Sequence, residues 1–253
     1  MFVIPAKAGI CAVIPSEGEA RSEESLVTYS LLFTLYSSMS EIVTTYLLSN
    51  PDEPMPMDRG DFYKEQTEAF FNNQLPKRAV EIVQVLLFTP DKDIILEKRA
   101  RTKNHNPGLI DKAVGGHITF GNSPTYTVVT ETIQELEVPS MVLNDKEDFT
   151  KTYKLLRSHL TSLALVQYID TRIQNLPKII GGKLMPIMDK YHFYLGVFGG
   201  SIRPADKEAA GILFYSYDSF QEEIDKYPAL FTDELQFFLK RYNKKITEFL
   251  AKF

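Results

Sequence analysis

The chain has 253 residues, of which 44% are hydrophobic and 24% charged, as in an ordinary globular protein that can bury a sizeable core. Its net charge of −5 argues against a broad basic surface for nucleic acid, and its single cysteine excludes an internal disulfide framework and a cysteine-rich zinc site. No apolar run approaches the roughly 18 residues that a membrane span needs. We therefore expect a cytoplasmic protein with neither a membrane nor a nucleic-acid partner.

Residues 1–38 differ in composition from the rest of the chain. A short apolar opening leads into a patch rich in Glu, Ser and Arg, and the whole resembles translated repeat elements that precede a gene through a misplaced start codon. Four glutamates precede the apolar run at 26–36, whereas a signal peptide has basic residues there. We expect 1–38 to be a disordered or spurious extension without chemistry, and Met39 to be the true start.

The region 39–253 alternates between strand and helix patterns and is expected to form one domain. The expected strands lie at 41–48, 81–89, 94–98, 190–198 and 209–215, with a proline-rich turn at 50–56. The expected helices lie at 61–73, at 218–226 with Asp218 or Ser219 as its cap, and at 233–249.

Apolar residues spaced for burial along one helix face continue through 147–174. We therefore expect a long inserted helix over about 147–175, which either covers the functional site or contacts a partner. The oligomeric state stays open, with a homodimer as one alternative and this helix as its interface.

The segment 114–138, VGGHITFGNSPTYTVVTETIQELEV, carries the functional signal. Its residue types favour a strand, but its period favours a helix. Three polar side chains fall within an arc of roughly 100° on a helical wheel: Glu131, Gln134 and Glu135. Ser123 and Pro124 supply an N-cap and a first-turn proline. The helix is expected to bury Ile133 and Leu136 on the opposite side and to present its carboxylates outward.

The same segment resembles the Nudix box, which reads glycine, five residues, glutamate, seven residues, then Arg-Glu-apolar-x-Glu-Glu-x-Gly-apolar. With Gly116 as the first glycine, Glu131 and Glu135 match the box. Five positions depart from it. Asn122, Thr130 and Gln134 replace a glutamate, an arginine and a glutamate. Thr132 stands at the first apolar position, and Glu137 replaces the closing glycine. The resemblance runs from about 42 to about 242. It implies an α/β/α sandwich with a mixed central sheet.

In this family the helix glutamates bind Mg²⁺ or Mn²⁺ and prepare a water for attack on a diphosphate. The resemblance implies that Glu131 and Glu135 are catalytic metal ligands and that Glu208 adds a further carboxylate. Gln134 is a weaker ligand than a carboxylate, because its oxygen is neutral. His117 is either a ligand or a turn histidine. The implied partner is a small-molecule diphosphate substrate, such as a nucleoside diphosphate linked to another group.

The layout also resembles the isopentenyl diphosphate isomerase-like branch of the family, in which basic residues near the first core strands face the substrate. On that analogy four residues are candidate phosphate contacts: Arg78, Lys98, Arg99 and Arg101. They can equally be solvent-exposed strand ends. The isomerase carries a cysteine that aligns with Val114, so isomerase chemistry is not expected. Two interpretations stay open, a metal-dependent diphosphate hydrolase and a catalytically impaired module that binds a nucleotide or protein partner without turnover.

Overall fold

The computed structural model of the protein describes residues 3–5, 11–13, 41–203 and 209–253. It divides into a unit of Met1–Ser40 and a unit of Glu41–Phe253. In the first unit the described residues form an antiparallel strand pair, β1 (Val3–Pro5) and β2 (Cys11–Val13). The prediction for 1–38 falls mostly outside the described residues and stays a prediction.

In the second unit, the described residues place ten strands in one mixed sheet. These strands are β3 (Ile42–Leu47), β4 (Asn50–Asp58), β5 (Arg78–Phe88), β6 (Asp93–Arg99), β7 (Ile110–Lys112), β8 (Val114–His117), β9 (Ser140–Leu143), β10 (Ala164–Asn175), β13 (Met188–Val197) and β14 (Ala209–Ser216). A separate hairpin joins β11 (Lys178–Ile180) and β12 (Lys183–Met185). The helices are α2 (Arg59–Phe71), α3 (Pro124–Leu136), α4 (Lys146–Leu156), α5 (Tyr217–Lys226) and α6 (Asp233–Leu250).

Strand β5 is the centre of the sheet. One of its edges pairs in parallel with β13 along nearly its whole length. Its other edge pairs in succession with β3, β8 and β6. Ten of its eleven residues are buried, which explains why its sequence is a near-continuous apolar run. Because three partners share one edge of β5, the sheet bends around that strand.

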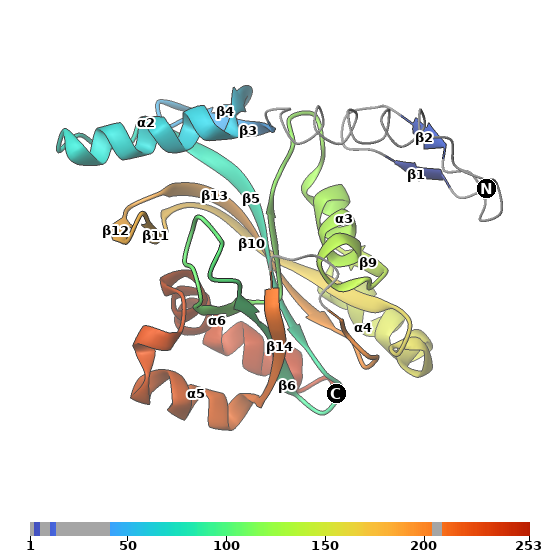
Figure 1. The fold of residues 1–253 in the computed structure, drawn as a ribbon. Coiled ribbons are helices and arrows are strands. Elements are labelled where there is room, and N and C mark those ends of the chain that lie inside the picture. Colours follow the sequence, from blue (N-terminus) through green and yellow to red (C-terminus); the bar gives the residue numbers. More distant parts are fainter. Residues whose placement is uncertain (1–2, 6–10, 14–40, 204–208) are drawn as a thin grey trace, which may run out of the picture. The chain divides into compact units, whose positions relative to one another are not determined.

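Helices cover both faces of this sheet, with α3 on one side of β5 and α5 and α6 on the other (Figure 1). Val83 and Val85 of β5 share a hydrophobic core with Val128 of α3. Ile82 and Leu86, which alternate with them, share the opposite core with Phe238 of α6. The expected α/β/α sandwich with a mixed central sheet is confirmed. Among the described helices, none combines the length and apolar character needed to cross a bilayer.

The long inserted helix expected at 147–175 is wrong. Helix α4 ends at Leu156, a single 3₁₀ turn follows at Arg157–His159, and 164–175 forms β10 between β9 and β13. Strand β9, helix α4 and strand β10 make a βαβ unit, because β9 and β10 are parallel. The apolar spacing fitted a helix because Leu160 and Val166 are both buried, although Leu160 lies in the turn after the 3₁₀ helix and Val166 lies in β10. The dimer interface expected on that helix loses its basis.

Two smaller expectations also fail. The proline-rich turn at 50–56 belongs to β4, which pairs with β3 in register Thr44↔Pro56. Prolines are tolerated there because an edge strand need not donate on its outer side. Helix α5 begins after Ser216 rather than at Asp218 or Ser219. The other expected helices and strands are confirmed within a few residues at their ends.

Candidate metal and diphosphate site

Helix α3 begins as its sequence predicts, but it is rotated from the predicted orientation. Ser123 accepts a hydrogen bond from the amide of Tyr126 at 3.1 Å, and Pro124 occupies the first turn. The buried side chains of α3 are Thr127, Val128, Thr132 and Leu136. Ile133, expected in the core, is 48% exposed. The helix therefore does not turn its glutamates away from the sheet.

Two glycines of β8 explain this rotation. Gly115 donates its backbone N–H to Oε2 of Glu135 at 3.2 Å. A Cβ added at Gly116 would collide with the carboxylate of Glu131. Both glutamates are half-buried. A side chain at Gly116 would fill the space of Glu131, whereas a Cβ at Gly115 would meet Lys112 and Gln84 rather than Glu135. The expectation that the carboxylates point outward is wrong for Glu131 and Glu135, whereas Gln134 is exposed.

A histidine and a carboxylate that sequence reasoning missed lie on the same face of the sheet. Gly116, Val83 and His192 are Cα partners in one row across β8, β5 and β13, and side chains in a row share a face. His192 Nε2 lies 2.8 Å from Oε1 of Glu81, two residues before Val83. Tyr46 donates its hydroxyl to the other oxygen of Glu81 at 3.1 Å. The signal in the sequence was a polar residue, Glu81 or His192, within a largely apolar stretch of a strand.

On the other side of β8, His117 joins an aromatic group. Its Nε2 lies 3.0 Å from the hydroxyl of Tyr63 on α2, and the ring of Tyr63 lies 4.3 Å from that of His105, centre to centre. Burial, and then the charges of Lys178, Arg59 and Arg99, lower the pKa of His105 to about 3. His105 is therefore neutral at physiological pH. Burial is the largest cause of this shift in the pKa of His105, and the three nearby cations add to it.

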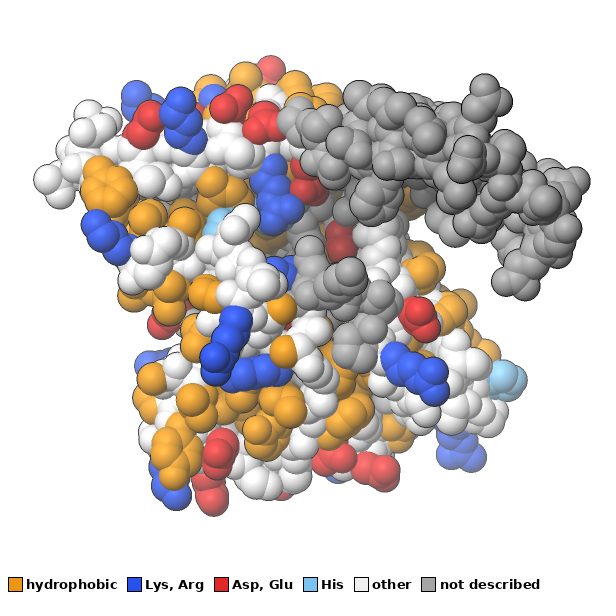
Figure 2. All heavy atoms as spheres, viewed as in Figure 1, with side chains coloured by type: hydrophobic (Ala, Val, Ile, Leu, Met, Phe, Trp, Pro, Cys, Tyr) orange, Lys and Arg blue, Asp and Glu red, His pale blue; other side chains and the backbone are white. Residues whose placement is uncertain are grey.

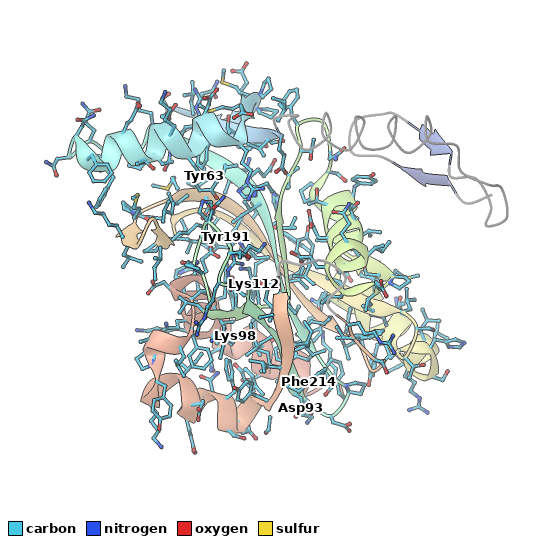
Figure 3. The ribbon with its side chains drawn as sticks, viewed as in Figure 1. Tyr63, Asp93, Lys98, Lys112, Tyr191 and Phe214 are labelled. Carbon is cyan, nitrogen blue, oxygen red and sulfur yellow. The ribbon has the colours of Figure 1, made fainter. Side chains whose placement is uncertain are left out.

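A buried ionic cluster lies close to this group. Its Lys178 lowers the pKa of His105, and its Glu234 raises it. Five buried charged side chains form the cluster: Asp111, Lys112, Lys178, Asp189 and Glu234. Glu234 bridges the two lysines, with 3.2 Å between its Oε2 and Lys112 Nζ and 3.2 Å between its Oε1 and Lys178 Nζ. Lys178 Nζ also lies 3.1 Å from Oδ2 of Asp189. Figure 3 shows Lys112 between Tyr63 above and Lys98 below.

The pKa values within this cluster move in opposite directions. Burial raises the pKa of Asp189, although Lys178 opposes the rise. Burial acts in the same sense on Glu234, but Lys178 and Lys112 outweigh it and lower its pKa. Glu97, at the rim of the cluster, has its pKa raised to about 7 by burial and by the neighbouring charge of Asp111. The ionised forms of Asp189 and Glu234 therefore depend on the nearby charges of Lys178 and Lys112.

The four candidate phosphate contacts have different surroundings. Arg99 Nη1 lies 3.2 Å from Oε1 of Glu97 and 3.4 Å from Oδ2 of Asp111, and its side chain also donates to the carbonyl of His105. Burial alone would lower the pKa of Arg99, but nearby carboxylates, Glu135 among them, raise it. Arg78 Nε lies 3.5 Å from Oε2 of Glu65. Two further candidates differ in exposure, Lys98 being half-buried and Arg101 exposed. Figure 2 shows Lys and Arg side chains near the middle of the face of the molecule that is in view.

The residues of the site can hold a divalent cation through two carboxylates, those of Glu131 and Glu135. The described residues include no group of three or more His, Cys, Asp or Glu arranged to hold a metal. Mg²⁺, however, is commonly held by one or two carboxylates and completes its shell with water and substrate phosphates. Glu131 and Glu135, one helical turn apart over β8, supply two carboxylates of that kind. Glu208, the expected further carboxylate, lies outside the described residues.

No family model matches the sequence, and no curated protein matches it. Among solved structures, the DR0079 protein of Deinococcus radiodurans is 12% identical, with a TM-score of 0.48, over 74% of this chain and 90% of that one. A MutT protein of Methanosarcina mazei Go1 is 12% identical, with a TM-score of 0.44, over 66% and 94% of the two chains. A NUDIX hydrolase of Nitrosomonas europaea is 10% identical, with a TM-score of 0.40, over 66% and 90%. The chain is thus similar in structure to Nudix hydrolases at low sequence identity. Its place in the isomerase-like branch stays a prediction.

Proposed function

We propose that the protein is a Nudix-type hydrolase that cleaves a diphosphate bond in a nucleoside diphosphate-linked or related substrate, with Mg²⁺ or Mn²⁺ as cofactor. The observation that supports the proposal most is the packing of Glu131 and Glu135 over Gly115 and Gly116. The box spacing alone left those carboxylates on an outer face. Their inward position beside β8 is what a cation shared with a diphosphate requires.

The residues divide into two roles in this proposal, metal ligands and phosphate contacts. Glu131 and Glu135 hold the metal, with Glu208 as a further ligand. Gln134 is exposed and His117 contacts Tyr63 on the other side of β8, so we assign neither of them to the metal. The bound metal neutralises charge on the diphosphate oxygens and lowers the pKa of the attacking water. The basic residues hold the phosphates: Arg78, Lys98, Arg99 and Arg101. Of these four, Arg99 feels the charge of Glu135, although Glu97, Asp111 and the carbonyl of His105 already bind its guanidinium.

The experiment that tests the proposal measures phosphate or nucleotide release from a panel of nucleoside diphosphate derivatives, using the full chain with Mg²⁺, with Mn²⁺ and with a chelator. We expect release from at least one substrate class that requires the metal. Release that persists in the chelator would contradict the metal's role. No release from any compound would favour the impaired binding module.

Three substitutions in the box support that second candidate, since Asn122, Thr130 and Gln134 each subtract an anionic ligand or its support. The variant Gln134→Glu separates the two candidates. A crippled enzyme should gain turnover from a third carboxylate on α3, whereas a binding module should gain at most metal affinity.

A glycine substitution tests the position of Glu131. In Gly116→Ala, the added Cβ would occupy the place of the Glu131 carboxylate, so we expect kcat/KM to fall about 10–100-fold while the fold is retained. Gly211→Ala is the matched control, because a Cβ there meets nothing within 4 Å. Hydrolysis rates and thermal melting of both variants check the prediction. Equal activity in the two would show that the position of the Glu131 carboxylate does not matter.

A further inference from the structure

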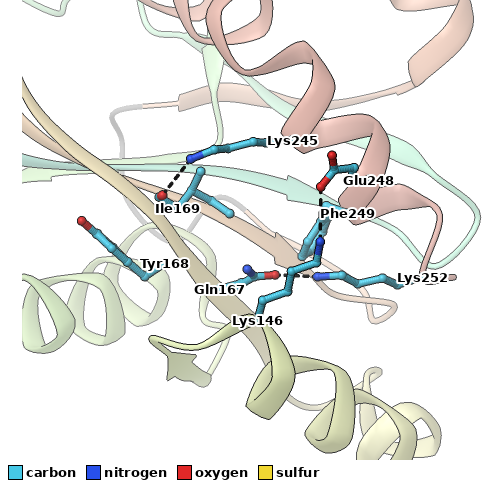
Figure 4. Close-up of a pocket in the computed structure, with 8 residues that line it drawn as sticks. All are labelled: Lys146, Gln167, Tyr168, Ile169, Lys245, Glu248, Phe249 and Lys252. Carbon is cyan, nitrogen blue, oxygen red and sulfur yellow. Dashed lines mark hydrogen bonds and ion pairs between the residues drawn. The ribbon is translucent and has the colours of Figure 1, made fainter.

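A pocket lies away from the box, between α4, β10 and the end of α6 (Figure 4). Its volume is about 190 Å³. That volume holds several water molecules, yet it is below the roughly 300–1,000 Å³ of sites for drug-sized ligands. The lining includes none of the box residues. A ligand of this pocket must therefore be smaller than a nucleotide and distinct from the proposed substrate.

The pocket is lined by three lysines and one glutamate: Lys146, Lys245, Lys252 and Glu248. The only acidic group of the lining, Glu248, pairs with Lys146 at 3.2 Å, and both side chains are about half exposed or more. Such an exposed ion pair is weak and opens at little cost. Three lysines thus face one glutamate, and the lining carries a net positive charge.

The backbone of β10 is shaped around one of these lysines. The pairing of β10 with β13 shifts register between Tyr168 and Asp170, which leaves Ile169 outside the ladder. The carbonyl of Ile169 accepts a hydrogen bond from Lys245 Nζ at 3.1 Å. Bulges of this kind commonly re-aim groups beside functional sites. Lys245 is thus held at the pocket by the fold of the central sheet.

Lys252 is the most constrained of the three lysines. Its Nζ donates to Oε1 of Gln167 at 2.6 Å and lies 4.6 and 5.0 Å from the ring centres of Phe149 and Phe249. Burial, and then the charge of Lys146, lower the pKa of Lys252 to about 8. An ammonium held on an apolar floor beside a second lysine gains from a nearby anion. The amide NH₂ of Gln167 is a further donor for such a ligand.

We propose that this pocket is a binding site for a small phosphate-class anion, either inorganic phosphate or the phosphate of a small phosphomonoester. Lysine is a common phosphate ligand because its ammonium acts as a mobile point charge. Three ammonium groups, from α4, α6 and the turn that follows α6, match the several oxygens of a phosphate better than the single charge of a monocarboxylate. The site is independent of the diphosphate hydrolase proposed above.

Calorimetric titration of the full chain with inorganic phosphate and with glycerol phosphate, at pH 7 and without divalent metal, tests the proposal. We expect saturable binding that Lys252→Met weakens about tenfold or more, since a hydrogen bond to a charged group contributes about 1.5–3 kcal/mol. Saturation by phosphate but not by glycerol phosphate would identify a free-phosphate site, and the reverse a phosphomonoester site. NMR of the lysine ammonium groups should show the pKa of Lys252 rising from about 8 as the anion binds.

Lys244→Met is the matched control, because Lys244 is the neighbour of Lys245 on α6, is exposed and does not line the pocket. It should bind phosphate as the wild type does. If Lys252→Met does not fold, Lys245→Met carries the same comparison. Absence of saturable binding, or equal binding by the wild type and the lysine pocket variants, would overturn the proposal.

Discussion

Replacing Glu135 by glutamine should abolish metal-dependent diphosphate hydrolysis, with a loss of more than about 100-fold in kcat/KM. Loss of a group that only orients a metal ligand typically costs 10–100-fold, so loss of a ligand itself should cost more. Glutamine keeps the size of the side chain and can still accept from Gly115. The loss would therefore report the missing charge rather than a packing defect. Steady-state rates in Mg²⁺ and in Mn²⁺ measure the effect.

Glu137→Gln is the control for that variant. Glu137 ends the same helix in the left-handed conformation, and its side chain is exposed. The substitution removes the same charge two residues away without touching β8. We expect near wild-type rates from it. Comparable losses in both variants would mean that the net charge of α3, and not a ligand at Glu135, controls the reaction.

Replacing Lys178 by methionine should give the largest loss of stability. Lys178 compensates Asp189 and Glu234, which are both buried. Removing one partner of a buried ionic network leaves uncompensated charge and typically costs 3–5 kcal/mol, so we expect the free energy of unfolding to fall by about that amount. Urea unfolding followed by circular dichroism measures it.

The pH dependence of that variant gives a second readout. Without Lys178, the folded-state pKa of Asp189 rises further above its unfolded value, and the pKa of Glu234 rises from its lowered value. A carboxyl group with a raised folded pKa contributes stability at acid pH that is lost as the pH rises through that value. Lys178→Met should therefore be less destabilised at pH 5 than at pH 8. Lys64→Met, an exposed lysine on α2, should unfold as the wild type does at both pH values. Equal destabilisation of Lys178→Met at pH 5 and 8 would contradict the ionic cluster.

The sequence predicted the existence and bounds of α3, because its cap and its period are local features. It did not predict the rotation of α3. A helical wheel ranks faces by hydrophobicity, and on that ranking Ile133 belongs inside and two glutamates belong outside. The structure reverses this ranking because, on a strand before the helix, Gly116 leaves room for Glu131 and the backbone N–H of Gly115 binds Glu135. Whether a strand leaves such space beside a helix depends on which strand packs against that helix, and the local sequence of the helix does not show this.

Two other parts of the fold depended on partners far away in the sequence. Strand β10 has an apolar pattern that suits either a helix or a strand, and its pairing with β9 and β13 decides the matter. The ionic cluster joins Lys112, Lys178 and Glu234 from three separated segments. Each of these residues alone resembles a surface charge in the sequence. Only the folded chain shows that they neutralise one another in its interior.

Binding of Mn²⁺ reports directly on whether Glu131 and Glu135 together hold a divalent cation. Electron paramagnetic resonance of the full chain titrated with Mn²⁺ would count the bound ions in the wild type and in the double variant Glu131→Gln, Glu135→Gln. We predict one bound Mn²⁺ in the wild type, held more tightly when a non-hydrolysable nucleoside diphosphate analogue is present, and its loss in the double variant. Identical Mn²⁺ binding by the two proteins would contradict a cation site at Glu131 and Glu135.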